Sequence, residues 1–315
     1  MKMNREHGFI QHHFYSGYKS GAGFTLIELL VVISIVSLLA SVVYASLSNA
    51  RGKATVAAGQ QFSGQVKRAL YDKAAIYLDF DSLAVGANLT TELSKNNQGT
   101  LVLPTAITYQ TGTASLTTDT TLYKRGNHLI VNAAPTYGII YSPVSGLNTI
   151  MESLNYTLSG WLLVPAGVSG TVVIVGEDVA GSGNYGVANL KACLSNGNVT
   201  GVTANYPNNG GQLVVPSSGC EPVSVPSGQW VHLAVSVKNK NNGTVDITFF
   251  ANGKQLNTYN KSAAYSGANA SFFIGSGGNA NYQFDEVAIF SQALTASDFH
   301  AIYAAGAAEH GLAVK

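Results

Sequence analysis

The sequence predicts a mainly β protein in which a long N-terminal α-helix is followed by a two-sheet antiparallel β-sandwich. Three observations support this fold class. An apolar stretch without charge, Gly or Pro runs from Leu29 to Ala50. From residue 75 onward, short apolar runs alternate with Gly, Asn, Pro and Ser, as strands alternate with turns. Charged residues make up 10% of the chain, against roughly 25% in an average soluble protein, and no βαβ alternation is visible.

Residues 1–23 read as a leader peptide. They contain Lys2, Arg5 and Lys19 but only one acidic residue, Glu6, and they show no helical periodicity. A basic, unstructured segment before an apolar helix is typical of the cytoplasmic side of a membrane.

Residues from about 24 to 47 are apolar enough to cross a membrane. About 20 apolar residues in a helix span the bilayer core. We therefore expect a single-pass protein of the cytoplasmic membrane with its head, residues 75–315, on the extracytoplasmic side. An uncleaved anchor would have the same hydropathy, and a secretory signal cut near Val43-Tyr44-Ala45 is a second alternative. The length of the apolar core and Glu28 inside it argue against the secretory signal.

Glu28 is the residue that distinguishes this segment from a simple membrane anchor. A carboxylate within an apolar helix costs up to about 3 kcal/mol on insertion scales. A simple anchor has no use for it, whereas a helix that packs beside its copies does, if each Glu28 meets a positive partner. The amino terminus created by cutting before Phe24 of a neighbouring chain would be such a partner.

The six residues Gly23-Phe24-Thr25-Leu26-Ile27-Glu28 resemble the class III signal of type IV pilins and type II secretion pseudopilins. The resemblance covers residues 23–50. It implies that a prepilin peptidase cuts after Gly23 and methylates the new amino terminus of Phe24. It also implies that Glu28 guides assembly with other pilin subunits into a cell-surface filament.

The helix is expected to continue beyond the membrane to residue 74. Phe62, Val66, Ala69 and Leu70 follow one helical stripe. Such a stripe is more often a packing surface than a binding site, so we expect it to pack under the head.

The head contains more than ten strand candidates. The Asn252-Gly253 pair between two of them is a strong hairpin signal. One helix is expected at Thr295–Ala305. The clearest strand candidates are Tyr156–Val164, Trp230–Lys238, Thr244–Ala251 and Phe284–Phe290.

Five segments of the head resemble, in the correct order, the concanavalin A-like, laminin G-like jelly rolls. The resemblance covers residues from about 76 to 306 and implies that the sandwich is a jelly roll. The five segments are Ile76–Asp81, Ser94–Leu101, Tyr156–Trp161, Gly228–Ala234 and Phe284–Phe290.

The head is not expected to be an enzyme. Glycosidases of the wider fold need two carboxylates across a cleft, and the acidic residues here are few and scattered. Asp285 and Glu286 are adjacent on a strand, so they are expected to point to opposite faces. We interpret them as structural, with a calcium-binding role for Asp285 as the alternative, and no other cofactor is expected.

Four tyrosines next to Asn- and Gly-rich loops are candidate ligand contacts. Aromatic faces offer the apolar surface on which sugar rings pack. For each of them, an ordinary turn tyrosine is the competing interpretation. The four are Tyr185, Tyr206, Tyr265 and Tyr282.

Cys193 and Cys220 are the two cysteines of the chain. Because the head is expected to face an oxidising space, we predict that they form a disulfide.

The leading hypothesis is therefore a filament subunit of the type IV pilin kind, minor or adhesive, whose head binds glycans or surface proteins. A pseudopilin of a type II secretion or DNA-uptake filament is the alternative, and an anchored glycoside hydrolase is less favoured. A formal net charge of +1 without basic clusters disfavours nucleic acid as a partner.

Overall fold

The computed structural model describes residues 23–81, 83, 97–104, 109–110, 113–118, 127–132, 139–141, 143–179, 188–208, 211–265, 270–276, 280–307, 309–310 and 312. The chain forms two compact units, Met1–Thr55 and Val56–Lys315. The division falls inside the long helix, whose last turns pack as part of the head.

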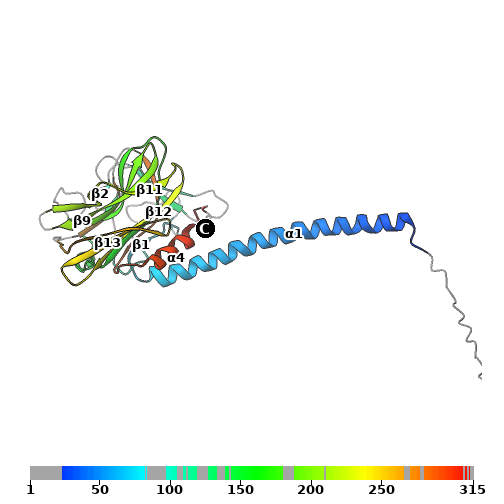
Figure 1. The fold of residues 1–315 in the computed structure, drawn as a ribbon, viewed down its shortest axis with the longest axis horizontal. Helices are drawn as coiled ribbons and strands as arrows, with labels where there is room; N and C mark the ends of the chain where they lie inside the picture. Colours follow the sequence, from blue (N-terminus) through cyan, green and yellow to red (C-terminus); the bar gives the residue numbers. More distant parts are fainter. Residues whose placement is uncertain are drawn as a thin grey trace, which may run out of the picture. The chain divides into compact units, whose positions relative to one another are not determined.

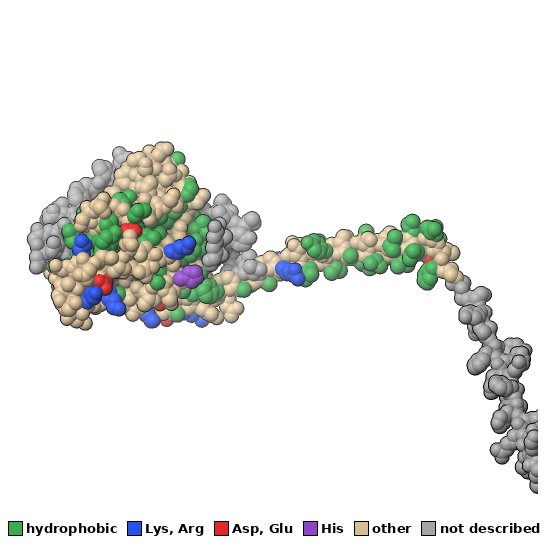
Figure 2. All heavy atoms as spheres, in the orientation of Figure 1, with side chains coloured by type: hydrophobic (Ala, Val, Ile, Leu, Met, Phe, Trp, Pro, Cys, Tyr) green, Lys and Arg blue, Asp and Glu red, His purple; other side chains and the backbone are tan. Residues whose placement is uncertain are grey.

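The N-terminal helix α1 runs without interruption from Leu26 to Val66. It is followed directly by a π-helical turn, η1 (Lys67–Tyr71). Figure 2 shows hydrophobic side chains along the exposed surface of α1. A surface of this kind is stable in lipid and not in water.

The head is a sandwich of two antiparallel sheets, with eight strands each among the described residues (Figure 1). The first sheet has the order β14-β13-β12-β6-β16-β4-β3, and β1 pairs with β16 beside this path. Its strands are β1 (Ala74–Leu78), β3 (Thr113–Thr118), β4 (Asn127–Asn132), β6 (Tyr156–Leu163), β12 (Trp230–Asn239), β13 (Thr244–Ala251), β14 (Lys254–Ser262) and β16 (Asn281–Phe290).

The second sheet has the order β10-β9-β8-β7-β15-β5-β2, and β11 pairs with β9. Two short helices, α3 (Leu147–Glu152) and α4 (Ala296–Ala307), complete the head. The strands are β2 (Tyr109–Gln110), β5 (Ile139–Tyr141), β7 (Gly170–Val179), β8 (Ala188–Ser195), β9 (Asn198–Asn208), β10 (Gly211–Val215), β11 (Glu221–Val225) and β15 (Ala270–Ser276).

The main core lies between the two sheets. Leu158 of β6, Ile174 of β7 and Val235 of β12 are among its fully or almost fully buried members. Val231, Leu233, Val235 and Val237 of β12 all join this core, and the residues between them are buried on the opposite face. Period-two alternation turns one face of a strand inward.

A second apolar layer covers the outer face of the first sheet, and we call it the back layer. The end of α1, η1 and α4 pack there against residues of β1, β12, β13 and β16. From α1 and η1 it takes Val66, Leu70 and Tyr71, whereas Phe62 and Ala69 of the predicted stripe are exposed. Trp161 and Trp230 are buried, and they lie beside α4 in a small cluster with Ala307.

Local sequence signals account for the turns and helix starts near this layer. Asn252 and Gly253 both have positive φ, and Ala251 pairs with Lys254, so the predicted two-residue hairpin is confirmed. Helix α4 begins one residue after the expected start. The Thr295 backbone N–H donates to Asp298, and the Asp298 N–H donates to the Thr295 hydroxyl, which satisfies two unpaired donors.

Candidate functional sites: the amino-terminal motif and the head

The amino-terminal motif folds as the start of α1. Glu28 Oε2 accepts hydrogen bonds from the backbone N–H and the hydroxyl of Thr25, both at 2.9 Å. The Glu28 N–H in turn donates to the Thr25 hydroxyl oxygen at 3.3 Å. This reciprocal pattern is a capping box. The spacing Thr-x-x-Glu is the sequence signal for it, so Glu28 has a partner within its own chain besides the one expected in a neighbouring chain.

Within the described residues, one helical segment, Leu26–Tyr71, is long and apolar enough to cross a membrane. Gly23 and Phe24 lie exposed just before it. Their roles in cleavage and methylation stay predictions.

Of the candidate tyrosines within the described residues, two are buried. Tyr206 and Tyr282 are each 1% exposed, so their rings do not offer the surface expected of a ligand contact. Both lie in strands, β9 and β16, and face the core between the sheets. The Asn and Gly residues that follow Tyr206 closely are typical of a loop. Its alternation with the buried Val202 and Ala204 indicates instead that it points inward.

Tyr265 is half-buried and its hydroxyl is already engaged. It donates to Glu177 Oε1 at 3.3 Å and lies 3.2 Å from Asn148 Oδ1. Burial, followed by the nearby Glu177 carboxylate, raises the pKa of Tyr265 above its usual value. Tyr185 lies outside the described residues.

Asp285 and Glu286 do not point to opposite faces, which corrects the expectation for this pair. Glu286 has a φ of 46°, and the register with β6 shifts between Asp285 and Ala288. Such a bulge breaks the alternation of a strand. Asp285 Oδ2 reaches His310, and Glu286 Oε2 accepts from Trp161 Nε1 at 3.1 Å. Because the His310 ring stacks on Trp161, both carboxylates lie on the back-layer side of the sheet.

This arrangement gives Asp285 protein partners in place of solvent. Its Oδ1 accepts the Glu286 N–H at 2.9 Å, and its Oδ2 lies 3.2 Å from His310 Nε2. Among the described residues, no group of three or more His, Cys, Asp or Glu side chains could hold a metal ion. The calcium role of Asp285 stays a prediction.

Ser159 and His232 form a buried hydrogen-bonded pair on neighbouring strands. Ser159 Oγ lies 2.8 Å from His232 Nε2, and the two side chains are fully or almost fully buried. Burial lowers the pKa of His232 to about 4, so the imidazole is neutral at pH 7. A serine–histidine pair suggests acyl transfer chemistry, but this one lies in the closed packing next to Trp161 and Phe299. It fits a structural hydrogen bond.

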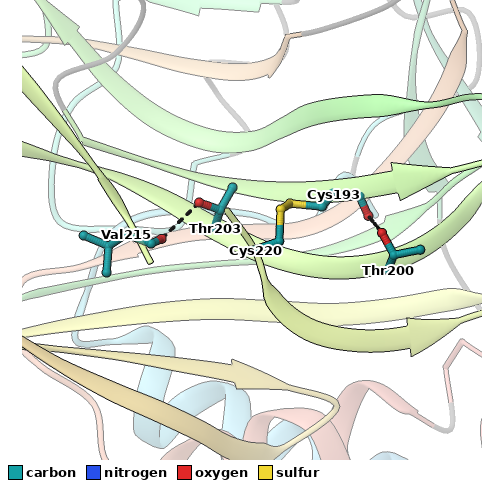
Figure 3. Close-up of a disulfide and its surroundings, with 5 residues drawn as sticks. All are labelled: Cys193, Thr200, Thr203, Val215 and Cys220. Carbon is teal, nitrogen blue, oxygen red and sulfur yellow. Dashed lines mark hydrogen bonds between the residues drawn. A yellow bond between two sulfur atoms is a disulfide. The ribbon is translucent and has the colours of Figure 1, made fainter. Parts of the chain in front are cut away.

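A disulfide joins Cys193 of β8 to Cys220, the residue before β11 (Figure 3). It holds the connection between β10 and β11 against the second sheet. A Cβ atom on Gly201 of β9 would lie 2.7 Å from Cys220 Cβ, so this close approach requires glycine. Thr200 and Thr203 donate to the carbonyls of Cys193 and Val215 on either side of the bond.

The structure has the fold of known binding domains. It resembles the binding domain of Paraclostridial Mosquitocidal Protein 1, with a TM-score of 0.51 and 17% identity over 74% of this chain and 52% of the other. The binding domain of Botulinum neurotoxin DC, solved in complex with rat synaptotagmin II, gives 0.49 and 10% over 74% and 52%. This chain thus spans about half the length of these structures, and at such identities the likeness shows the fold alone.

Two families match the sequence, and no curated protein does. Residues 19–44 match the prokaryotic N-terminal methylation motif. Residues 140–299, just over half of the chain, match the family described as the concanavalin A-like lectin/glucanases superfamily. The chain therefore joins a pilin-type methylation motif to a lectin-like sandwich, and it belongs to the concanavalin A-like lectin/glucanases superfamily.

Proposed function

We propose that this protein is a subunit of a type IV pilin-like filament that displays a lectin-like binding head. The observation that carries the proposal is the methylation motif at the start of an apolar helix that continues without interruption to the head. A membrane anchor alone needs neither the motif nor Glu28. A prepilin peptidase would cut after Gly23 and leave Phe24 as the methylated first residue.

The head is proposed to bind neutral glycans or surface proteins without turning them over. The sandwich is much larger than helix-to-helix packing in a filament requires. Loops on a rigid β scaffold are where recognition usually lies. The low net charge favours neutral ligands over nucleic acid. The lectin-like fold supports binding by analogy only, because one fold hosts many functions.

Two measurements test the two halves of this function. Imaging of purified filaments with a label on the head should place the protein in or on the filament. The full chain in detergent should bind members of a glycan array and leave a panel of glycosidase substrates intact. Turnover of any substrate would overturn the non-enzymatic assignment.

The pseudopilin alternative predicts a different pattern. Deletion of the gene would then abolish protein secretion or DNA uptake, and no surface filament would carry the label. Tight binding to a surface protein, with no binding on the glycan array, would assign the head to protein recognition.

A further inference from the structure

The end of α1 is fastened to the head by a compact set of ion pairs. Lys67 Nζ lies 2.8 Å from Glu286 Oε1 and 3.1 Å from Glu309 Oε2. One turn earlier in the helix, the Ser63 hydroxyl donates to Glu309 Oε1 at 2.8 Å. We call Ser63, Lys67, Glu286 and Glu309 the clasp. All four belong to the compact unit Val56–Lys315.

Glu286 connects the clasp to the middle of the first sheet. It lies on β16, which pairs with β6, β4 and β1. Its second oxygen accepts from Trp161 Nε1 at 3.1 Å and lies 3.5 Å from the Tyr71 hydroxyl. The left-handed backbone at Glu286 is the reason that this side chain faces the helix. A non-glycine residue in that conformation persists only where its surroundings hold it.

Glu309 connects the clasp to the segment that follows α4. The next residue, His310, lies 3.2 Å from Asp285 Oδ2 and 2.8 Å from the Gly306 carbonyl oxygen. Its ring stacks on Trp161 with centroids 4.1 Å apart. This segment is therefore anchored to the sheet by contacts that do not involve α1.

The clasp is largely shielded from water. The exposed fractions of the side chains are 22% for Lys67, 3% for Glu286 and 25% for Glu309. Burial opposes the charge on Lys67, yet the two carboxylates raise its pKa above the usual value. Burial likewise opposes the charge on Glu286, and Lys67 lowers the pKa of that carboxyl. Removing Lys67 would leave two carboxylates facing each other without a cation, which is strongly unfavourable.

We propose that the clasp carries pulling force between the helix and the head. The proposal rests on the proposed function, because a helix held in a filament and a head bound to a surface would pull on residues 56–73. Along the backbone, that force reaches β1, whose strand partner within the described residues is β16 and which also accepts backbone hydrogen bonds from residues 98–101. The clasp provides a second route, directly to the centre of β16 and to the anchored C-terminal segment.

The test is force spectroscopy on the full chain in detergent, with one handle at the amino terminus and one at the exposed residue Ser195. Before the sandwich unfolds, release of residues 56–73 from the head should lengthen the molecule by at most about 60 Å. We call this increase in length the early step. At a fixed force, Lys67→Met should speed this step about tenfold or more, while the later unfolding of the sandwich is unchanged. Lys240→Met is the matched control, since Lys240 pairs with Asp246 at 3.4 Å in a more exposed position.

An early step with the same rate in Lys67→Met and Lys240→Met overturns the proposal. If Lys67→Met does not fold, Glu309→Gln decides in its place, because it removes one charge from a partly exposed position. It should speed the early step relative to the wild type and to Lys240→Met, and no change would overturn the proposal. The measurement requires neither ligand nor filament. A protein that fails to assemble or to bind would therefore refute the proposed function and leave the clasp result intact.

Discussion

At the scale of single residues, Glu28 has one role in the structure and a second one in the proposed function. Its hydrogen bonds with Thr25 cap α1 within one chain, and its negative charge is available to a neighbouring chain. Since Oε2 accepts both hydrogen bonds from Thr25, Oε1 is the oxygen that a partner would approach.

Two substitutions of Glu28 should separate these roles. We expect Glu28→Ala to insert into the membrane and be cleaved after residue 23 but to lose most filament incorporation. Glu28→Gln keeps the capping box, because glutamine serves at that position, but lacks the charge. Filament yield and N-terminal mass spectrometry measure both steps. Normal filament yield from Glu28→Gln would show that capping, and not charge, is what assembly needs.

His232 should make the head sensitive to acid. Its folded-state pKa is about 4, whereas an unfolded chain has a histidine pKa of about 6.5. Between these values the unfolded state binds more protons, so stability falls as pH falls. By pH 5, the free energy of unfolding has lost about 2 kcal/mol through the protonation of His232 in the unfolded chain.

Denaturant unfolding at pH 7 and pH 5 measures this loss. His232→Gln has no group that titrates in this range, so it should lose about 2 kcal/mol less than the wild type between the two values. Equal losses in the two proteins would exclude His232 as the source of the acid sensitivity.

At the scale of elements, the sequence predicts best what depends on near neighbours. The apolar run of α1, the Asn252-Gly253 hairpin and the start of α4 are each specified by residues within a few positions. The bulge at Glu286 was missed because its left-handed backbone depends on Lys67 and Trp161, which are distant in sequence. For Tyr206 and Tyr282, the neighbouring Asn and Gly residues indicate a loop, whereas the alternation of the strands places both side chains in the core.

The same limit applies to the back layer. A helical stripe was expected, and Val66 and Leu70 belong to it, but the buried face is shifted toward Ser63 and Tyr71. The partners of these residues come from β16 and from the end of the chain, and no local pattern encodes that pairing.

The disulfide between β8 and the residue before β11 makes a measurable contribution to the free energy of unfolding. Its cysteines are 27 positions apart, and closing such a loop stabilises a protein by about 3 kcal/mol on the chain-entropy model. We expect Cys220→Ser to lower the free energy of unfolding by about that amount. The Cys193→Ser/Cys220→Ser double variant should cost no more than the single, because either change opens the same loop. Free thiols detected in the secreted protein without reductant would reject the pairing.

At the scale of the whole molecule, processing should reverse the sign of the net charge. The full chain has a formal charge of +1, and residues 1–23 contribute three basic residues against one acidic residue. Cleavage after Gly23 therefore changes the formal charge from +1 to −1. Isoelectric focusing should show the mature protein at a lower isoelectric point than the precursor. Gly23→Val, which places a side chain at the cleavage position, should keep the precursor value, and a shifted band in that variant would contradict cleavage at this site.

The sandwich of the head has its first and last strands side by side. Ala74, where the first strand starts, pairs with Phe290, where the last strand ends, and the Ser291 hydroxyl donates to the Lys73 carbonyl at 3.4 Å. A domain whose ends are neighbours can be joined to a host chain at one point without rerouting either of them. Such a head can be exchanged during evolution, because gene rearrangement could replace it with another domain on the same helix. One filament would then gain new binding specificities while its assembly machinery stays the same.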